Sequence, residues 1–131
     1  MIRLSHLTKK YGAFTAVDDL CVDVREGEVL GLLGPNGAGK TTTFYIIVGF
    51  IRPDAGTVAI GGQDISPLPM YKRARLGIGY LPQEASIFRR MTVEENVLSI
   101  LETLPLSRAQ RRERLEELLA EMGIEHVRRS R

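Results

Sequence analysis

The stretch Gly34-Pro35-Asn36-Gly37-Ala38-Gly39-Lys40-Thr41-Thr42 decides the fold of this chain. It satisfies the phosphate-binding loop pattern G-x-x-x-x-G-K-[ST] at every fixed position. An apolar run at residues 29–33 precedes it, and helix-compatible residues 42–48 follow it. A glycine-rich turn with a solvated lysine is the plainer interpretation, but it does not account for these flanks. The residues therefore predict a strand at 29–33, a nucleotide-binding loop and a helix, in that order.

The chemistry of the loop follows from its residue types. Glycines let successive backbone N–H groups converge on a phosphate, and the next helix adds the partial positive charge of its N-terminus. Lys40 is expected to reach the β- and γ-phosphates, Thr41 to give its hydroxyl to Mg²⁺, and Thr42 to bond a phosphate oxygen. We expect ATP and Mg²⁺ as ligands. The expected contact residues are Gly34, Pro35, Asn36, Gly37, Ala38, Gly39, Lys40, Thr41 and Thr42.

Length and composition limit the class of protein to which this chain can belong. A chain of 131 residues with 44% hydrophobic residues fits one globular domain. Its longest apolar run, at residues 44–51, is too short to span a bilayer, and the N-terminus lacks a signal core. One cysteine, Cys21, suits a reducing cytoplasm. Basic residues cluster at 72–75, 89–90 and 108–114, but without a recognition motif we expect no nucleic-acid partner.

The remaining patterns indicate an α/β fold with a partly antiparallel subsheet. Capping boxes Thr92-x-x-Glu95 and Ser107-x-x-Gln110 open two late helices, the first of which runs to about residue 101. Gly123 is expected to end the second. Strands are predicted at residues 2–7, 20–24, 57–60 and 78–81, a short helix at 69–75, and one apolar face of the last helix at Leu115, Leu118, Leu119 and Met122.

Residues around the loop resemble the nucleotide-binding subunits of ATP-binding-cassette (ABC) transporters. Tyr11 lies upstream, where the family has an aromatic residue that stacks on adenine. Gln83 matches the glutamine loop, whose neutral amide approaches Mg²⁺ and the attacking water, and residues 92–96 match the helix start that follows. The resemblance implies catalytic roles for Lys40 and Gln83 and a metal contact for Gln83. Plainer alternatives stay open: a surface tyrosine and a strand-end amide.

Within the family, residues 41–45, 68–75 and 78–90 are similar to the subunits that energise lipopolysaccharide export in Gram-negative bacteria. The similarity covers residues 4 to about 127. It implies a cytoplasmic ATPase, peripheral on the inner membrane, that works as a homodimer and contacts the membrane only through transmembrane permease subunits. Phe88 would be an apolar anchor in the permease groove, with Arg89 and Arg90 at its rim. Plain loop residues are the alternative.

Several family elements are expected after Arg131: the signature sequence, the strand ending in Asp-Glu and the switch histidine. Residues 60–64, with Gly61-Gly62, superficially match the signature, but they precede Gln83 and follow a strand, so we expect a turn there. His6 and His126 lie in the wrong contexts and are expected at the surface.

The chain thus resembles the truncated N-terminal part of one P-loop NTPase (ABC ATPase) domain. Residues 1–82 would be the core and antiparallel subsheet, and 83–131 the glutamine loop and the start of the helical subdomain. We expect the parent protein to hydrolyse ATP, and this chain to do so slowly or not at all. The alternatives are an importer ATPase of the branched-chain amino-acid type and a non-hydrolysing nucleotide-binding fragment.

Overall fold

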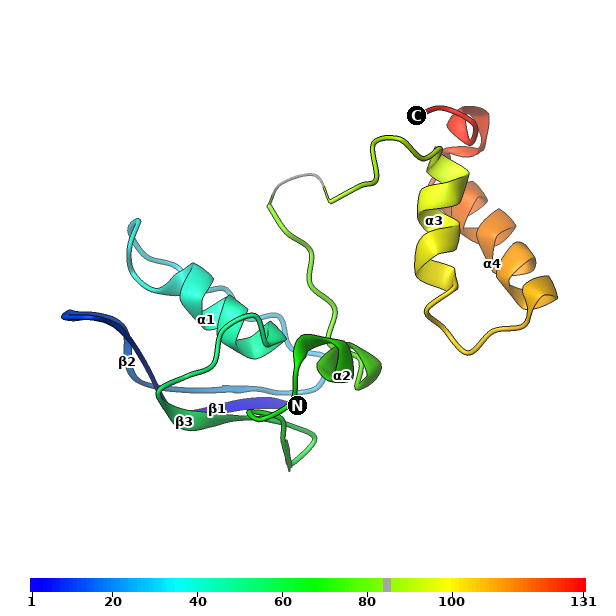
Figure 1. The fold of residues 1–131 in the computed structure, drawn as a ribbon. Coiled ribbons are helices and arrows are strands. Elements are labelled where there is room, and N and C mark those ends of the chain that lie inside the picture. The colour runs from blue at the N-terminus through cyan, green and yellow to red at the C-terminus, as the bar shows by residue number, and fades with distance from the viewer. Residues whose placement is uncertain (84–85) are drawn as a thin grey trace. The chain divides into compact units, whose positions relative to one another are not determined.

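The computed structural model describes residues 1–83 and 86–131, which form two compact units, Met1–Tyr80 and Leu81–Arg131 (Figure 1). Glu84 and Ala85, part of the stretch that resembles the export subunits, lie outside the described residues. The division at about residue 82 into a core and a helical subdomain stays a prediction, because compactness alone does not say which subdomain each unit represents.

The first unit is built on a four-stranded antiparallel sheet with strand order β2-β1-β3-β4. β1 (Ile2–Tyr11) and β2 (Phe14–Val24) form a hairpin. β3 (Ala55–Ile60) and the short β4 (Gln63–Asp64) continue the sheet on the other side of β1. The strands predicted at residues 2–7, 20–24 and 57–60 are confirmed. They are longer than predicted, because cross-strand pairing carries β1 and β2 through to their tight turn.

The turn at Gly61 and Gly62 joins β3 to β4. The expectation that these glycines make a turn is therefore confirmed. They do not open a helix, so their backbone N–H groups have no helical N-terminus behind them. This removes the geometry that the signature sequence needs.

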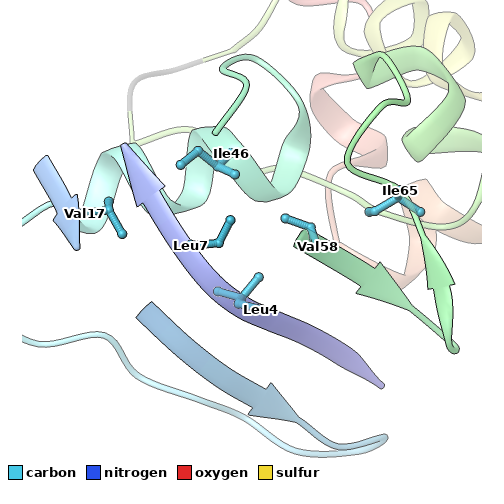
Figure 2. Close-up of a cluster of buried hydrophobic side chains, with 6 residues drawn as sticks. All are labelled: Leu4, Leu7, Val17, Ile46, Val58 and Ile65. Atoms are coloured by element: carbon cyan, nitrogen blue, oxygen red, sulfur yellow. The ribbon is translucent and has the colours of Figure 1, made fainter. Parts of the chain in front are cut away.

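Apolar side chains from the sheet and from α1 (Lys40–Val48) form the core of the first unit. Figure 2 shows Ile46 of α1 lying next to Leu7 of β1. Burying a side chain of this size contributes roughly 1.5–3 kcal/mol, so the contact holds α1, and the loop before it, against the sheet. The fully packed members of this cluster are Leu4, Leu7, Val17, Ile46, Val58 and Ile65.

Arg73 of α2 (Met70–Arg75) is buried, with 1% of its surface exposed. Arg73 is therefore set apart from its basic neighbours Lys72 and Arg75, which are exposed, and the sequence pattern alone did not indicate this difference. Its planar guanidinium carries five N–H donors in a fixed fork, which suits several carbonyls at once. Burial lowers the pKa of the Arg73 guanidinium, which stays charged at neutral pH. It donates to the carbonyl oxygens of Ile46 (2.6 Å), Ile47 (2.9 Å), Ser66 (2.9 Å) and Leu68 (2.8 Å).

Two predicted strands, at residues 29–33 and 78–81, are wrong for the part of the chain that the structure describes. Val29, Leu33 and Leu81 are 97%, 96% and 92% exposed. A strand exists only where a neighbour accepts and donates its ladder hydrogen bonds, and none of the four strands runs beside either segment. The apolar pattern of these segments is a local property of the sequence, whereas strand formation also requires a partner strand from elsewhere in the chain.

The second unit packs α3 (Val93–Leu101) against α4 (Arg108–Glu121), followed by a short 3₁₀ turn, η1 (Glu125–Val127). Both predicted capping boxes are confirmed, since each cap side chain and its partner three residues later bond reciprocally. Gly123 ends the helix region with a φ of 65°. Met122 was wrongly placed on the apolar face: it is 62% exposed, because α4 ends before it. Leu101, Leu115 and Leu119 form the buried centre.

Residues 128–130, called here the C-terminal strap, fasten the start of α3. Val93 N–H donates to the carbonyl of Ser130 (2.9 Å), and Glu94 N–H donates to that of Arg128 (3.0 Å). The Arg128 side chain also pairs with Glu94 (3.0 Å) and Glu116 (2.8 Å), which raises the pKa of Arg128 and lowers that of Glu116. Both helices are thereby tied to the strap.

Among the helices of the described residues, none combines the length and the apolar character that a membrane crossing requires.

Candidate phosphate-binding site

The loop that precedes α1 turns tightly just before the helix. Ala38 N–H donates to the carbonyl of Pro35 (3.2 Å), and α1 begins at Lys40. Gly37 and Gly39 have φ values of 84° and 80°, in the left-handed region that glycine adopts without strain. The predicted order of loop and helix is therefore present, although the preceding segment is not a strand.

Gly39 is also where the loop meets the sheet. An ideal Cβ built on Gly39 overlaps the carbonyl oxygen of Ala16 and lies 3.3 Å from a methyl carbon of Val17, both in β2. The site thus leaves room for backbone only. Ala16 lies two residues along β2 from Phe14, the partner of Tyr11 in the hairpin. The hairpin end that carries Tyr11 is therefore the end nearest to the loop.

Tyr11 is partly exposed at this hairpin end. The residue is 48% exposed, and the Lys9 ammonium lies 5.6 Å from its ring centroid. An aromatic ring in this setting can stack on a planar base. The geometry fits the expected adenine contact, and that contact stays a prediction.

The N-terminus of α1 is open to an anion. Gly39 occupies the cap position without a side-chain cap, and the first turn of the helix carries no acidic residue. Within residues 1–83 and 86–131, no protein acceptor binds the N–H groups of Gly39, Lys40, Thr41 or Thr42. Unpaired first-turn N–H groups and the helix dipole together favour a negatively charged ligand.

Lys40 folds back over the loop that precedes it. Its ammonium donates to the carbonyl oxygens of Gly34 (2.6 Å) and Pro35 (2.7 Å). These contacts hold one unit of positive charge close to the start of α1, where it would attract the negatively charged phosphates of a nucleotide. Loop, helix terminus and ammonium therefore form one concentrated site of positive potential.

The three consecutive threonines, Thr41 to Thr43, differ in how far they are buried. Thr41 is exposed, as a hydroxyl that reaches Mg²⁺ must be, and Thr42 is partly exposed. Thr43 is 3% exposed, and its hydroxyl donates to the carbonyl of Gly39 (3.0 Å). Sequence reasoning assigned no role to Thr43. The helical period that turns residue 43 inward was the signal that could have found it.

No cluster of three metal-ligating side chains exists among the described residues. Mg²⁺ binds with few protein ligands when a nucleotide supplies phosphate oxygens, so the exposed Thr41 hydroxyl fits such an ion without an acidic cage. His6 and His126 are exposed, as expected. His6 pairs with Asp19 (2.8 Å).

The other predicted site residues belong to the second unit. Gln83 is exposed, and its approach to the phosphate loop stays a prediction. Phe88 is 60% exposed, and Arg89 and Arg90 are exposed beside it. Their contact with a permease also stays a prediction. Sequence reasoning missed Asn96, whose side chain bonds the backbone of Phe88.

Gly39→Ala is expected to lower the free energy of unfolding by about 2 kcal/mol, because a Cβ adds backbone strain and meets Ala16. Urea unfolding of the chain measures the loss. Gly37→Ala is the matched control, since its φ is equally positive but nothing lies within 4 Å of its Cβ. Equal losses in the two variants would contradict close packing of Gly39 on β2.

Comparison with known families decides the identity of the fold. The family model described as "ABC transporter" matches residues 17–131. The chain belongs to the ABC transporter family. The match includes residues 34–42, Gln83 and both capped helices, and the fold is that of the P-loop ABC ATPase cassette, truncated relative to full cassettes.

Relatives and solved structures of this ABC family agree with the match. The chain is 56% identical over 124 residues to a probable ABC transporter ATP-binding protein of Azorhizobium caulinodans, covering 95% of this chain and 44% of that protein. It is 53% identical over 126 residues to the lipopolysaccharide export system ATP-binding protein LptB of Escherichia coli K12, covering 95% and 52%. The chain therefore spans about half the length of these relatives.

A solved ATP-binding cassette of an ABC transporter superposes on this chain with a TM-score of 0.84 at 26% identity, covering 99% of this chain and 56% of that chain. A dimeric cassette in a post-hydrolysis state, bound to ADP and Pi, superposes with a TM-score of 0.78 at 27% identity, covering 98% and 60%. These neighbours support the cassette fold independently of the family model.

Proposed function

We propose that this chain binds Mg-ATP through residues 34–42. The observation that carries the proposal is the uncapped start of α1, whose unpaired N–H groups lie beside the Lys40 ammonium. ADP and Pi in a solved cassette of the same fold support a nucleotide as the anion. Lys40 supplies charge to the β- and γ-phosphates, and Thr41 and Thr42 contact Mg²⁺ and a phosphate oxygen.

Two further residues complete the proposed site. Tyr11 stacks on adenine from the hairpin end nearest to the loop. Gln83 brings a neutral amide to Mg²⁺ and the attacking water. Mg²⁺ adds charge neutralisation between the phosphates when it is bound. The protein residues position the phosphates and hold positive charge where phosphoryl transfer develops negative charge.

The whole protein that contains this sequence is proposed to be an ATPase that energises lipopolysaccharide export. Relatives named for that export system match at 53% identity over 95–98% of the chain. A relative that matches at 56% carries only the general name of an ABC transporter ATP-binding protein, so an importer of the branched-chain amino-acid type is the second candidate. A dimeric neighbour supports assembly of two cassettes.

We place the whole protein on the cytoplasmic face of the inner membrane, docked on transmembrane permease subunits through Phe88, Arg89 and Arg90. The exposed Phe88 ring, flanked by two exposed arginines, suits an apolar anchor with a charged rim. Purification of the full-length protein with its membrane partners tests the substrate class. Permeases that carry lipopolysaccharide support export, and permeases that carry amino acids overturn it.

Phe88→Ala in the full-length protein is expected to weaken permease assembly about tenfold, because an apolar anchor loses its buried ring. Titration onto purified permease subunits in detergent measures this change. Affinity for Mg-ATP should be unchanged in the same variant. Ile100→Ala is the control, since it removes a similarly exposed (62%) apolar side chain from the far end of α3. Equal binding by wild type and Phe88→Ala would remove Phe88 from the interface.

A further inference from the structure

Asn96 holds the backbone of the loop that precedes α3. Its Oδ1 accepts the N–H of Phe88 at 2.8 Å. Its Nδ2 donates to the carbonyl oxygens of Phe88 (3.2 Å), Met91 (3.3 Å) and Thr92 (2.9 Å). The amide orientation follows from these partners, because a backbone N–H requires the oxygen and three carbonyls require the nitrogen. One side chain therefore binds both polar backbone groups of Phe88.

The loop at residues 88–92 forms a tight turn, and the start of α3 that follows it is held by further hydrogen bonds. Met91 N–H donates to the carbonyl of Phe88 at 2.9 Å. Below it, the capping box of Thr92 and Glu95 closes the first turn of α3, and the C-terminal strap binds the next two N–H groups. The backbone of residues 88–92 is thus tied to the helix at several points.

The side chains of this loop point outward despite the fixed backbone. Ile87 and Phe88 are 62% and 60% exposed. An exposed apolar ring on a mobile loop loses conformational entropy when it docks, whereas a ring on a fixed backbone loses less. All the hydrogen bonds of the Asn96 side chain go to the backbone of this loop. By fixing that backbone, Asn96 can contribute to docking without touching the partner.

We propose that Asn96 is a positioning residue, which presents the Phe88 ring in one orientation to the permease subunits. The proposal rests on the proposed docking role of Phe88. It assigns to Asn96 no contact with the partner and no contact with nucleotide. Its effect on assembly should therefore pass entirely through Phe88.

The first test uses the 131-residue chain and needs no partner. Amide hydrogen exchange at Phe88 should be at least about tenfold faster in Asn96→Ala, because the N–H loses its acceptor. Ser99→Ala is the matched control. Its hydroxyl donates to the Asn96 carbonyl (2.7 Å) on the same helix, and its loss leaves the loop contacts intact. Unchanged exchange at Phe88 in Asn96→Ala would overturn the proposal.

The second test uses the full-length protein titrated onto purified permease subunits in detergent. Asn96→Ala is expected to weaken binding about tenfold, and Asn96→Asp similarly, because a carboxylate oxygen faces three carbonyls. In a Phe88→Ala background, Asn96→Ala should add less than about twofold, which a general loss of helix stability would not produce. Additive losses would overturn the positioning role.

The two proposals fail in different ways. Normal binding by Phe88→Ala contradicts the docking surface itself. Weak binding by Phe88→Ala with normal binding by Asn96→Ala contradicts only the positioning role. Melting temperatures show whether Asn96→Ala or Asn96→Asp fails to fold. If one does, amide hydrogen exchange at Phe88 in the other variant tests the positioning role.

Discussion

Replacing Arg73 with methionine is expected to lower the free energy of unfolding by about 3–5 kcal/mol, a large part of the total stability of a small domain. Methionine fills similar volume but leaves four carbonyl oxygens without a donor. Two of them, on Ile46 and Ile47, belong to the last turn of α1, where the helix has no further N–H groups of its own to offer. Urea unfolding followed by far-UV circular dichroism measures the loss.

Arg75→Met is the matched control for this prediction. Arg75 is on the same helix, is exposed, and lies 5.7 Å from the Tyr71 ring centroid without a buried partner among the described residues. Its replacement should cost less than about 1 kcal/mol. Arg73→Lys should fall between the two, because one ammonium cannot reproduce the planar fork. Similar losses for Arg73→Met and Arg75→Met would show that the buried network does not stabilise the fold.

Lys40→Ala is expected to weaken Mg-ATP binding by about 1.5–3 kcal/mol, or one to two decades, because a charge-assisted contact to phosphate is lost. Isothermal titration of Mg-ATP into the wild type and the variant measures this difference. The ammonium already lies on the Gly34 and Pro35 carbonyls beside the open helix terminus, so its loss removes charge from the centre of the site.

Lys72→Ala provides the control for net charge, since Lys72 is exposed on α2 and its neighbour Arg73 contacts the last turn of α1, at the opposite end of that helix from the loop. Its affinity for Mg-ATP should match that of the wild type. If Lys40→Ala also binds like the wild type, the phosphate loop does not hold the nucleotide through its lysine.

Local patterns were predicted well where the interacting groups are close in sequence. Thr92 and Glu95, and Ser107 and Gln110, cap their helices as their spacing indicated. Gly39 ends the loop with a positive φ, and Lys40 begins the helix. Each of these features depends on backbone groups within about four residues, so the sequence carries the whole requirement.

Features that depend on distant partners were mispredicted or missed. Arg73 lies in a run of basic residues whose burial the sequence reasoning did not address, and its burial follows from the carbonyls of α1, 26 and 27 residues away. The apolar runs at residues 29–33 and 78–81 read as strands but have no pairing neighbour in the described sheet. Asn96 lies within a recognised motif, yet its function depends on how the preceding loop folds back over it.

By itself, the sequence determined the phosphate loop, the helix caps and the family. These require only glycine at fixed backbone positions and polar side chains within one helical turn of their partners. Only the tertiary structure decided which basic residue is buried, which apolar segments pair, and which amide fixes the Phe88 loop. Burial and strand pairing depend on contacts between residues that are distant in sequence. Residue spacing within one segment does not indicate which distant residues those will be.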